Sequence, residues 1–167
     1  MSPFQVDKAL EARFEQEIRI ILSSQFIRRD ITADLEQATD FAIFRVDPFR
    51  VAVRLRRHSY YKAFKNQFTV RWSRPSGVLT EIDKIRKRFV THFLYGFIDQ
   101  LETKIIDWQL FNLDKFTDPK PLHVYRNSPP DSELAVYSID QFPTDFILAS
   151  SREPSTGGFS QTYRTSF

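Results

Sequence analysis

The sequence contains no cysteine, which excludes a disulfide scaffold, a thiolate zinc site and a cysteine nucleophile. It has four glycines, and two of them, Gly157 and Gly158, stand together near the end of the chain. It therefore has no glycine-rich phosphate loop, dinucleotide fingerprint or nucleophile elbow. His58, His92 and His123 are far apart with no ligand spacing, so we do not expect a histidine-rich metal site.

Long apolar runs are also missing, since none approaches the roughly 18 residues of a membrane span. The first turns of the chain are charged, which is not the pattern of a signal peptide. We therefore expect a soluble, cytoplasmic protein without membrane contact. Its 167 residues predict a single α+β domain over residues 1–149, followed by a Ser/Thr/Gly-rich tail over residues 150–167.

Aromatic residues and arginines are abundant. Phe supplies 17 of the 25 Phe, Tyr and Trp rings, which predicts a dense aromatic core. Residues 45–90 carry 13 positive and 3 negative charges, a net +10, whereas the rest of the chain carries 11 positive and 18 negative, a net −7. Nine of those 13 positive charges are Arg, which binds phosphate as a fork. Such a polarised chain favours a polyanionic partner, DNA or RNA, over a merely solvated basic sheet face.

Hydrophobic periodicity predicts the main elements. Apolar residues recur every three or four positions over residues 3–26, which predicts an amphipathic helix. Residues 38–46 and 50–57 read as two strands of a hairpin around an Asp-Pro turn, and in the second strand Val and Leu alternate with Arg. Further strands are predicted over residues 67–72, 104–113, 134–139 and 145–149.

A second helix is predicted from Thr80 onward, with an apolar stripe formed by Ile82, Ile85, Phe89, Phe93 and Phe97. This order of elements predicts an α+β fold with a mixed, largely antiparallel sheet flanked by helices.

Basic and aromatic side chains interleave after the second of these strands. Rings among Arg and Lys can stack on unpaired bases, although in a chain so rich in Phe most such rings belong to the core. The basic strand face can also pair with Asp34 and Glu36 instead of phosphate. The candidate nucleic-acid-binding residues are Arg54, Arg57, Lys62, Lys65, Arg71, Arg74, Tyr60 and Tyr61.

The order of several blocks resembles the PD-(D/E)xK, or restriction-endonuclease-like, superfamily. A helix bears Glu, a strand opens with Asp, and the next strand ends in a charged pair spaced i, i+2. The resemblance is to phage-type proteins of this kind and covers roughly residues 17–116. It rests on DLEQATD (34–40), VAVRLRR (51–57), FTVR (68–71), SGVLTEIDKI (76–85), FLYGF (93–97) and WQLFNLDKF (108–116).

The resemblance implies a restriction-endonuclease-like core and a Mg²⁺ or Mn²⁺ site. Glu17 matches the helix carboxylate of the superfamily and Asp40 its metal-binding Asp. The (D/E)xK pair falls on Arg54 and Arg56, where the sequence departs from the pattern, because Arg offers no oxygen ligand and does not deprotonate. On this resemblance Arg56 would stabilise charge on the phosphate, and Glu36 or Asp34 would join Asp40 as the second metal ligand.

Glu81 and Lys84 are an alternative replacement for that pair, although their i, i+3 spacing is also that of an ordinary surface ion pair.

Three functions follow as hypotheses. The first is nucleic-acid binding with metal-dependent phosphodiester cleavage by Asp40, Glu17 and Arg56. The second is binding without cleavage. The third is a phage-type accessory protein that binds a protein partner through its basic, aromatic face. A homodimer is compatible with the first, and no small-molecule cofactor is indicated.

Overall fold

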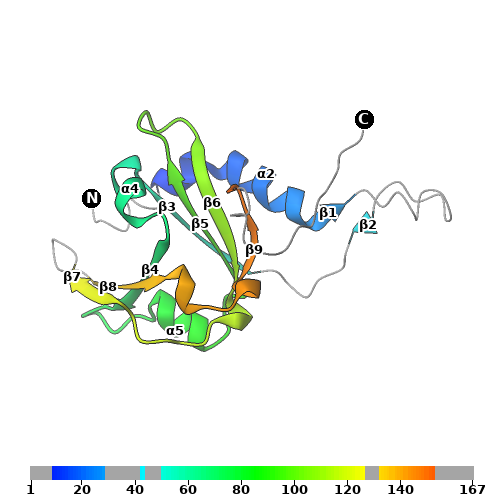
Figure 1. Ribbon diagram of the computed structural model, residues 1–167. Helices are drawn as coiled ribbons and strands as arrows, with labels where there is room; N and C mark the ends of the chain where they lie inside the picture. The colour runs from blue at the N-terminus through cyan, green and yellow to red at the C-terminus, as the bar shows by residue number, and fades with distance from the viewer. Residues whose placement is uncertain (1–8, 29–41, 44–49, 127–131, 153–167) are drawn as a thin grey trace.

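A computed structural model describes residues 9–28, 42–43, 50–126 and 132–152, and these residues form an α+β fold, as predicted (Figure 1). Their helices are α2 (Glu15–Phe26), α4 (Tyr61–Phe64) and α5 (Glu81–Arg86). Residues 9–13, just before α2, are also helical. The strands are β1 (Ile27–Arg28), β2 (Ala42–Ile43), β3 (Val51–Arg56), β4 (Gln67–Ser73), β5 (His92–Ile98), β6 (Ile105–Asn112), β7 (His123–Arg126), β8 (Glu133–Ser138) and β9 (Ile147–Ser150).

The strands make two principal sheets and one short ribbon. The first sheet has the order β3-β5-β6-β9, with β3 parallel to β5 and the other pairs antiparallel. The second has the antiparallel order β4-β8-β7, and β1 pairs with β2. The sequence predicted one sheet, whereas the aromatic core requires a second sheet to cover it.

Two clusters of buried side chains lie on opposite faces of the first sheet. One is mostly aliphatic and joins the helical segment of residues 10–21 to β3, β5 and β6. The other is aromatic and joins the opposite face to β4, β8 and α5. Figure 1 shows this order, with α2 on one side of the β3-β5-β6 sheet and α5 on the other. The expected dense aromatic core is therefore the layer between the two principal sheets.

The second predicted helix begins as expected but is wrong beyond Arg86, where the chain leads into strand β5. Thr80 does cap α5, because its hydroxyl accepts from the Asp83 amide while the Asp83 carboxylate accepts from the Thr80 amide. The helix nevertheless ends at Arg86, and Arg88 has a positive φ of 55°. Phe93 and Phe97 instead lie on β5 and pack in the aromatic core. The sequence suggested a helix because a spacing of four residues places side chains on one face of a helix, and it does the same on a strand.

All seven residues of β5 are buried, since the strand is covered on both faces. Gly96 allows this strand to pass close to its neighbours. A Cβ at this position would lie 3.1 Å from the Asp107 carbonyl oxygen and 3.1 Å from Leu55 Cδ2.

The predicted hairpin of residues 38–46 with residues 50–57 is wrong. Strand β3 pairs in parallel with β5, and β2, the part of residues 38–46 that the structure describes, pairs with β1. A parallel pair needs a long crossover, and here residues 57–91, with α4, β4 and α5, provide it. A local turn signal predicts a change of direction and does not choose the partner of the strand that follows.

The other strand predictions hold within two residues at each end, as β4, β6, β8 and β9 show. The predicted tail begins inside β9, and Arg152 bonds to the Asp107 carboxylate on β6; residues 153–167 lie outside the described part of the chain.

Tyr137 in β8 has a buried hydroxyl for which the described residues provide no hydrogen-bond partner. Burial, followed by the charge of Asp118, raises its pKa to about 12. We expect Tyr137→Phe to leave the free energy of unfolding unchanged or to raise it by about 1 kcal/mol, because the variant removes an unsatisfied polar group from the core.

Urea unfolding measures this difference. Tyr95→Phe is the matched comparison, because the Tyr95 hydroxyl lies 3.5 Å from Thr69 Oγ1 and its removal should bring no gain. Destabilisation by Tyr137→Phe beyond about 1 kcal/mol would show that the hydroxyl has a partner.

Candidate nucleic-acid interface

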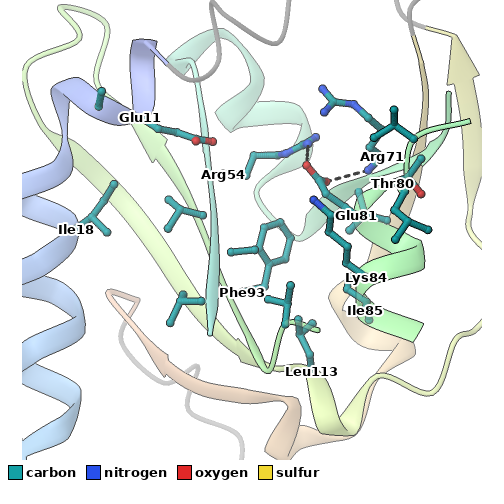
Figure 2. Close-up of a pocket in the computed structure, with 18 of the residues that line it drawn as sticks. Glu11, Ile18, Arg54, Arg71, Thr80, Glu81, Lys84, Ile85, Phe93 and Leu113 are labelled. Carbon is teal, nitrogen blue, oxygen red and sulfur yellow. Dashed lines mark hydrogen bonds and ion pairs between the residues drawn. The ribbon is translucent and has the colours of Figure 1, made fainter. Parts of the chain in front are cut away.

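A cleft of about 620 Å³ opens between the N-terminal helical segment with β3 on one side and β4 with α5 on the other (Figure 2). Its walls combine apolar and charged side chains. Of the predicted nucleic-acid-binding residues, Arg54, Arg71 and Arg74 line this cleft. Glu81 and Lys84, which the sequence left as an alternative pair, line it as well.

Glu81 connects the two sheets at the charged side of the cleft. It is the first residue of α5, directly after the Thr80 cap. One carboxylate oxygen forms an ion pair with Arg54 Nη2 on β3, and the other accepts a hydrogen bond of 2.9 Å from the Arg71 amide on β4. Figure 2 shows Glu81 between these two partners. Glu81 therefore holds α5, β3 and β4 together and is not a surface partner of Lys84.

The pKa of Glu81 is lowered by these contacts. Burial alone would raise it, but the charge of Arg54, the hydrogen bond from the Arg71 amide and the charge of Arg71 outweigh burial. The carboxylate is therefore ionised at neutral pH and compensates part of the positive charge of the two arginines.

Arg54 and Arg71 are both buried, with 7% and 5% of their surface exposed. Arg54 Nη1 also lies 3.4 Å from Thr69 Oγ1. Because both side chains are buried, they do not extend toward a ligand, and they contribute positive potential to the wall of the cleft. In total, five basic and three acidic residues line it, a net +2: Arg19, Arg54, Arg71, Arg74 and Lys84 against Glu11, Glu15 and Glu81.

The remaining predicted binding residues lie at the end of β3 and around α4, and none of them lines the cleft. Arg56 stacks on Tyr60 with its guanidinium carbon 4.4 Å from the ring centroid, a cation–π contact. Lys62 and Lys65 are exposed. Arg57 donates to Glu102 over 2.8 Å, so its charge is partly compensated within the protein.

Tyr61 belongs to the fold more than to this basic surface. Its ring meets the Phe97 ring edge-on at 5.3 Å, and its pKa is raised by burial and then by the neighbouring Asp107 carboxylate. Of the two adjacent tyrosines, Tyr60 is thus the exposed one.

The residues predicted for catalysis do not come together in the described part of the chain. Glu17 accepts a hydrogen bond of 2.9 Å from the Ile105 amide and so connects α2 to the start of β6. It does not line the cleft. Asp40, Glu36 and Asp34 lie outside the described residues.

The described residues do not fit the Mg²⁺ or Mn²⁺ site that the resemblance implies. Arg54 and Arg56 carry guanidinium groups, which have no lone pair for a hard cation. Glu81 is paired with Arg54. In residues 9–28, 42–43, 50–126 and 132–152 there is no group of three or more His, Asp or Glu that could hold a metal ion.

Sequence reasoning missed the acidic helical wall of the cleft and its apolar lining. Glu11, Glu15 and Arg19 come from the first helical segment and meet β3 and α5 only in the folded chain. The capping box of Thr80 and Asp83 is the local signal that places Glu81 at a helix start.

No family model matches this chain, and neither the curated proteins nor the solved structures include a significant match. The resemblance to the PD-(D/E)xK superfamily therefore stays a prediction. Among the described residues, no helix has the length and apolar character needed to cross a membrane.

Proposed function

We propose that this protein binds nucleic acid, with the cleft between β3 and α5 as the place where phosphate is held. The observation that carries the proposal is the pair of buried arginines, Arg54 and Arg71: the Arg54 guanidinium is ion-paired with Glu81, and the backbone amide of Arg71 donates to the same carboxylate. A polyanion is the partner that such a rigid excess of positive charge attracts.

The cationic groups of the cleft divide by exposure. Arg54 and Arg71 are buried, Arg74 is half-buried and Lys84 is exposed on α5. The buried pair supplies positive potential. Of the two exposed basic residues that line the cleft, Arg19 forms an ion pair with Glu15, so Lys84 is the one placed to follow a phosphate backbone. This arrangement is less costly than immobilising several exposed lysines, because the arginines are already ordered before binding.

More basic and aromatic side chains follow Arg54 along β3 and beyond its end. Arg56 follows Arg54 on β3 at i+2, which places both on one face of the strand about 7 Å apart. Arg56 stacks on the exposed ring of Tyr60, with Lys62 and Lys65 nearby in sequence on α4 and after it. A strand of nucleic acid bound at the cleft would therefore meet more basic and aromatic groups along β3.

We propose binding alone, because Glu17 accepts from the Ile105 amide and Arg56 stacks on Tyr60, while Asp40, Glu36 and Asp34 lie outside the described residues. The cleavage half of the first functional hypothesis stays a prediction.

An acidic protein partner is the second candidate. Tyr60, directly before α4, and Phe64, its last residue, are exposed with ring centroids 6.3 Å apart, and Lys62 lies on the same helix. Aromatic residues with Arg are typical of protein interfaces. If this candidate is correct, Tyr60→Ala abolishes capture of an acidic partner, and the protein purifies free of nucleic acid.

Lys84→Gln tests the proposed interface directly. With a phosphate contact at Lys84, we expect weaker binding to oligonucleotides of every sequence and a salt dependence whose log–log slope is smaller by about 1. Fluorescence anisotropy across a salt series in chelator measures both quantities.

Lys120→Gln is the matched control, because Lys120 is also exposed and does not line the cleft. Equal slopes for the wild type, Lys84→Gln and Lys120→Gln would contradict the placement of phosphate in the cleft.

A further inference from the structure

The cleft has an apolar interior that phosphate binding alone does not use. Of its 21 lining residues, 12 are apolar and 8 are charged. Val70, Ile85, Phe93 and Leu113 are buried members of the aromatic core that line the cleft, whereas Ala12, Val78 and Leu79 are lining residues with exposed apolar surface. A ligand that matches the whole cleft therefore has an apolar part as well as an anionic part.

The size of the cleft suits a ligand that enters it. Its volume of about 620 Å³ falls in the range of roughly 300–1,000 Å³ that small-molecule sites occupy in proteins. The charged residues Arg54, Arg71 and Glu81 lie together on the side formed by β3, β4 and α5, and the helical segment forms the facing wall (Figure 2). An anionic group at this side would leave a flat, apolar group directed between the walls.

Double-stranded nucleic acid does not meet these requirements. Its phosphates are on the outside, but its bases are stacked and paired inside the helix, so the apolar walls would stay unfilled. An unpaired strand exposes its bases, and each base has a flat face that packs against aromatic and apolar side chains. A nucleotide of an unpaired strand thus supplies both the anion and the apolar plane.

We propose that the cleft receives an unstacked base of single-stranded nucleic acid, with the adjoining phosphate at Lys84, in the positive potential of Arg54 and Arg71. This inference rests on the proposed function and makes it more specific. The protein prefers single strands to duplexes, and bases contribute to its affinity as well as phosphates.

Three oligonucleotides of equal length test the inference by fluorescence anisotropy in chelator: an intact single strand, an abasic single strand with the same phosphates, and a duplex. We expect the intact strand to bind at least about tenfold more tightly than the abasic strand, since a packed base adds affinity without adding charge. The duplex should bind more weakly than the intact strand.

Ala12→Trp tests whether this preference comes from the cleft. Ala12 is exposed on the helical wall and lines the cleft, so a large ring there obstructs the entry of a base without disturbing the core. The variant should reduce the affinity for the intact strand to that for the abasic strand and leave the abasic affinity unchanged. Ala9→Trp is the matched control, since Ala9 is exposed on the same helical segment outside the cleft.

The outcomes separate the two claims. Salt-dependent binding that is equal for intact and abasic strands, or tightest for the duplex, overturns the base pocket and leaves the phosphate interface standing. A preference for the intact strand that survives Ala12→Trp also overturns the pocket. Absence of binding to all three ligands at low salt overturns the proposed function itself.

Discussion

Glu81→Gln is expected to lower the free energy of unfolding by about 3 kcal/mol, because it removes the counter-charge of two buried arginines. The glutamine keeps the size of the side chain and one acceptor for the Arg71 amide. It removes the carboxylate that pairs with Arg54, whose side chain is 8% exposed. Urea unfolding followed by circular dichroism measures the loss.

Glu102→Gln is the control that distinguishes burial from charge. Glu102 is also 28% exposed and also bridges two arginines, Arg13 and Arg57, but those side chains are 55% and 54% exposed. Surface pairs of this kind contribute roughly 0–1 kcal/mol. Equal losses of stability for the two variants would show that the Arg54–Glu81 pair stabilises the fold no more than an exposed ion pair does.

The pH dependence of the same pair has a defined sign. Because the pKa of Glu81 in the folded protein is lowered from the ordinary value of 4.5, its ion pair stabilises the fold above that value. This contribution decreases as the pH falls below 4.5 toward the lowered pKa. The difference in stability between the wild type and Glu81→Gln should therefore shrink in acid.

Asp107→Asn is expected to lower the free energy of unfolding by about 2 kcal/mol, in the range of hydrogen bonds to charged groups. The Asp107 side chain on β6 is 3% exposed and accepts two contacts from Arg152 Nε, at 3.0 Å and 2.8 Å, and one from Ser151 Oγ at 3.2 Å. Its loss leaves Arg152 with the Lys65 carbonyl and the Asn66 side chain alone. The amides of β9 should also exchange faster with solvent.

Asp118→Asn is the matched control for this variant. Asp118 also accepts two hydrogen bonds from one arginine, Arg86, but both side chains are largely exposed. We expect a loss below about 1 kcal/mol for it. If Asp118→Asn destabilises the protein as much as Asp107→Asn, Arg152 does not anchor the end of the described chain.

Local patterns in the sequence were sufficient where alternation or capping decides the structure. The alternation of Val and Arg in β3 correctly placed Leu55 on one face and Arg54 on the other. The predicted helix start at Thr80 is correct, and there Thr80 and Asp83 form the capping box of α5. Alternation does not show whether the second face of a strand is covered. Arg54 was therefore expected on a polar surface, whereas the second sheet buries it.

Long-range pairing could not be predicted from one sequence. The four-residue spacing of Phe93 and Phe97 fits a helix and a strand equally, and only burial on both faces of β5 distinguishes them. Arg57 looked like a phosphate ligand because its partner Glu102 lies 45 residues away in the chain. The cleft itself depends on the docking of the first helical segment, which no local pattern encodes.

The most direct measurement is the affinity of the wild-type protein for a labelled single-stranded oligonucleotide across a salt series in chelator. A polyanion held by the cleft predicts micromolar or tighter binding at low salt that weakens linearly in log–log form as salt increases. Absence of binding at low salt, or binding that is indifferent to salt, would contradict a nucleic-acid interface at Arg54, Arg71 and Lys84.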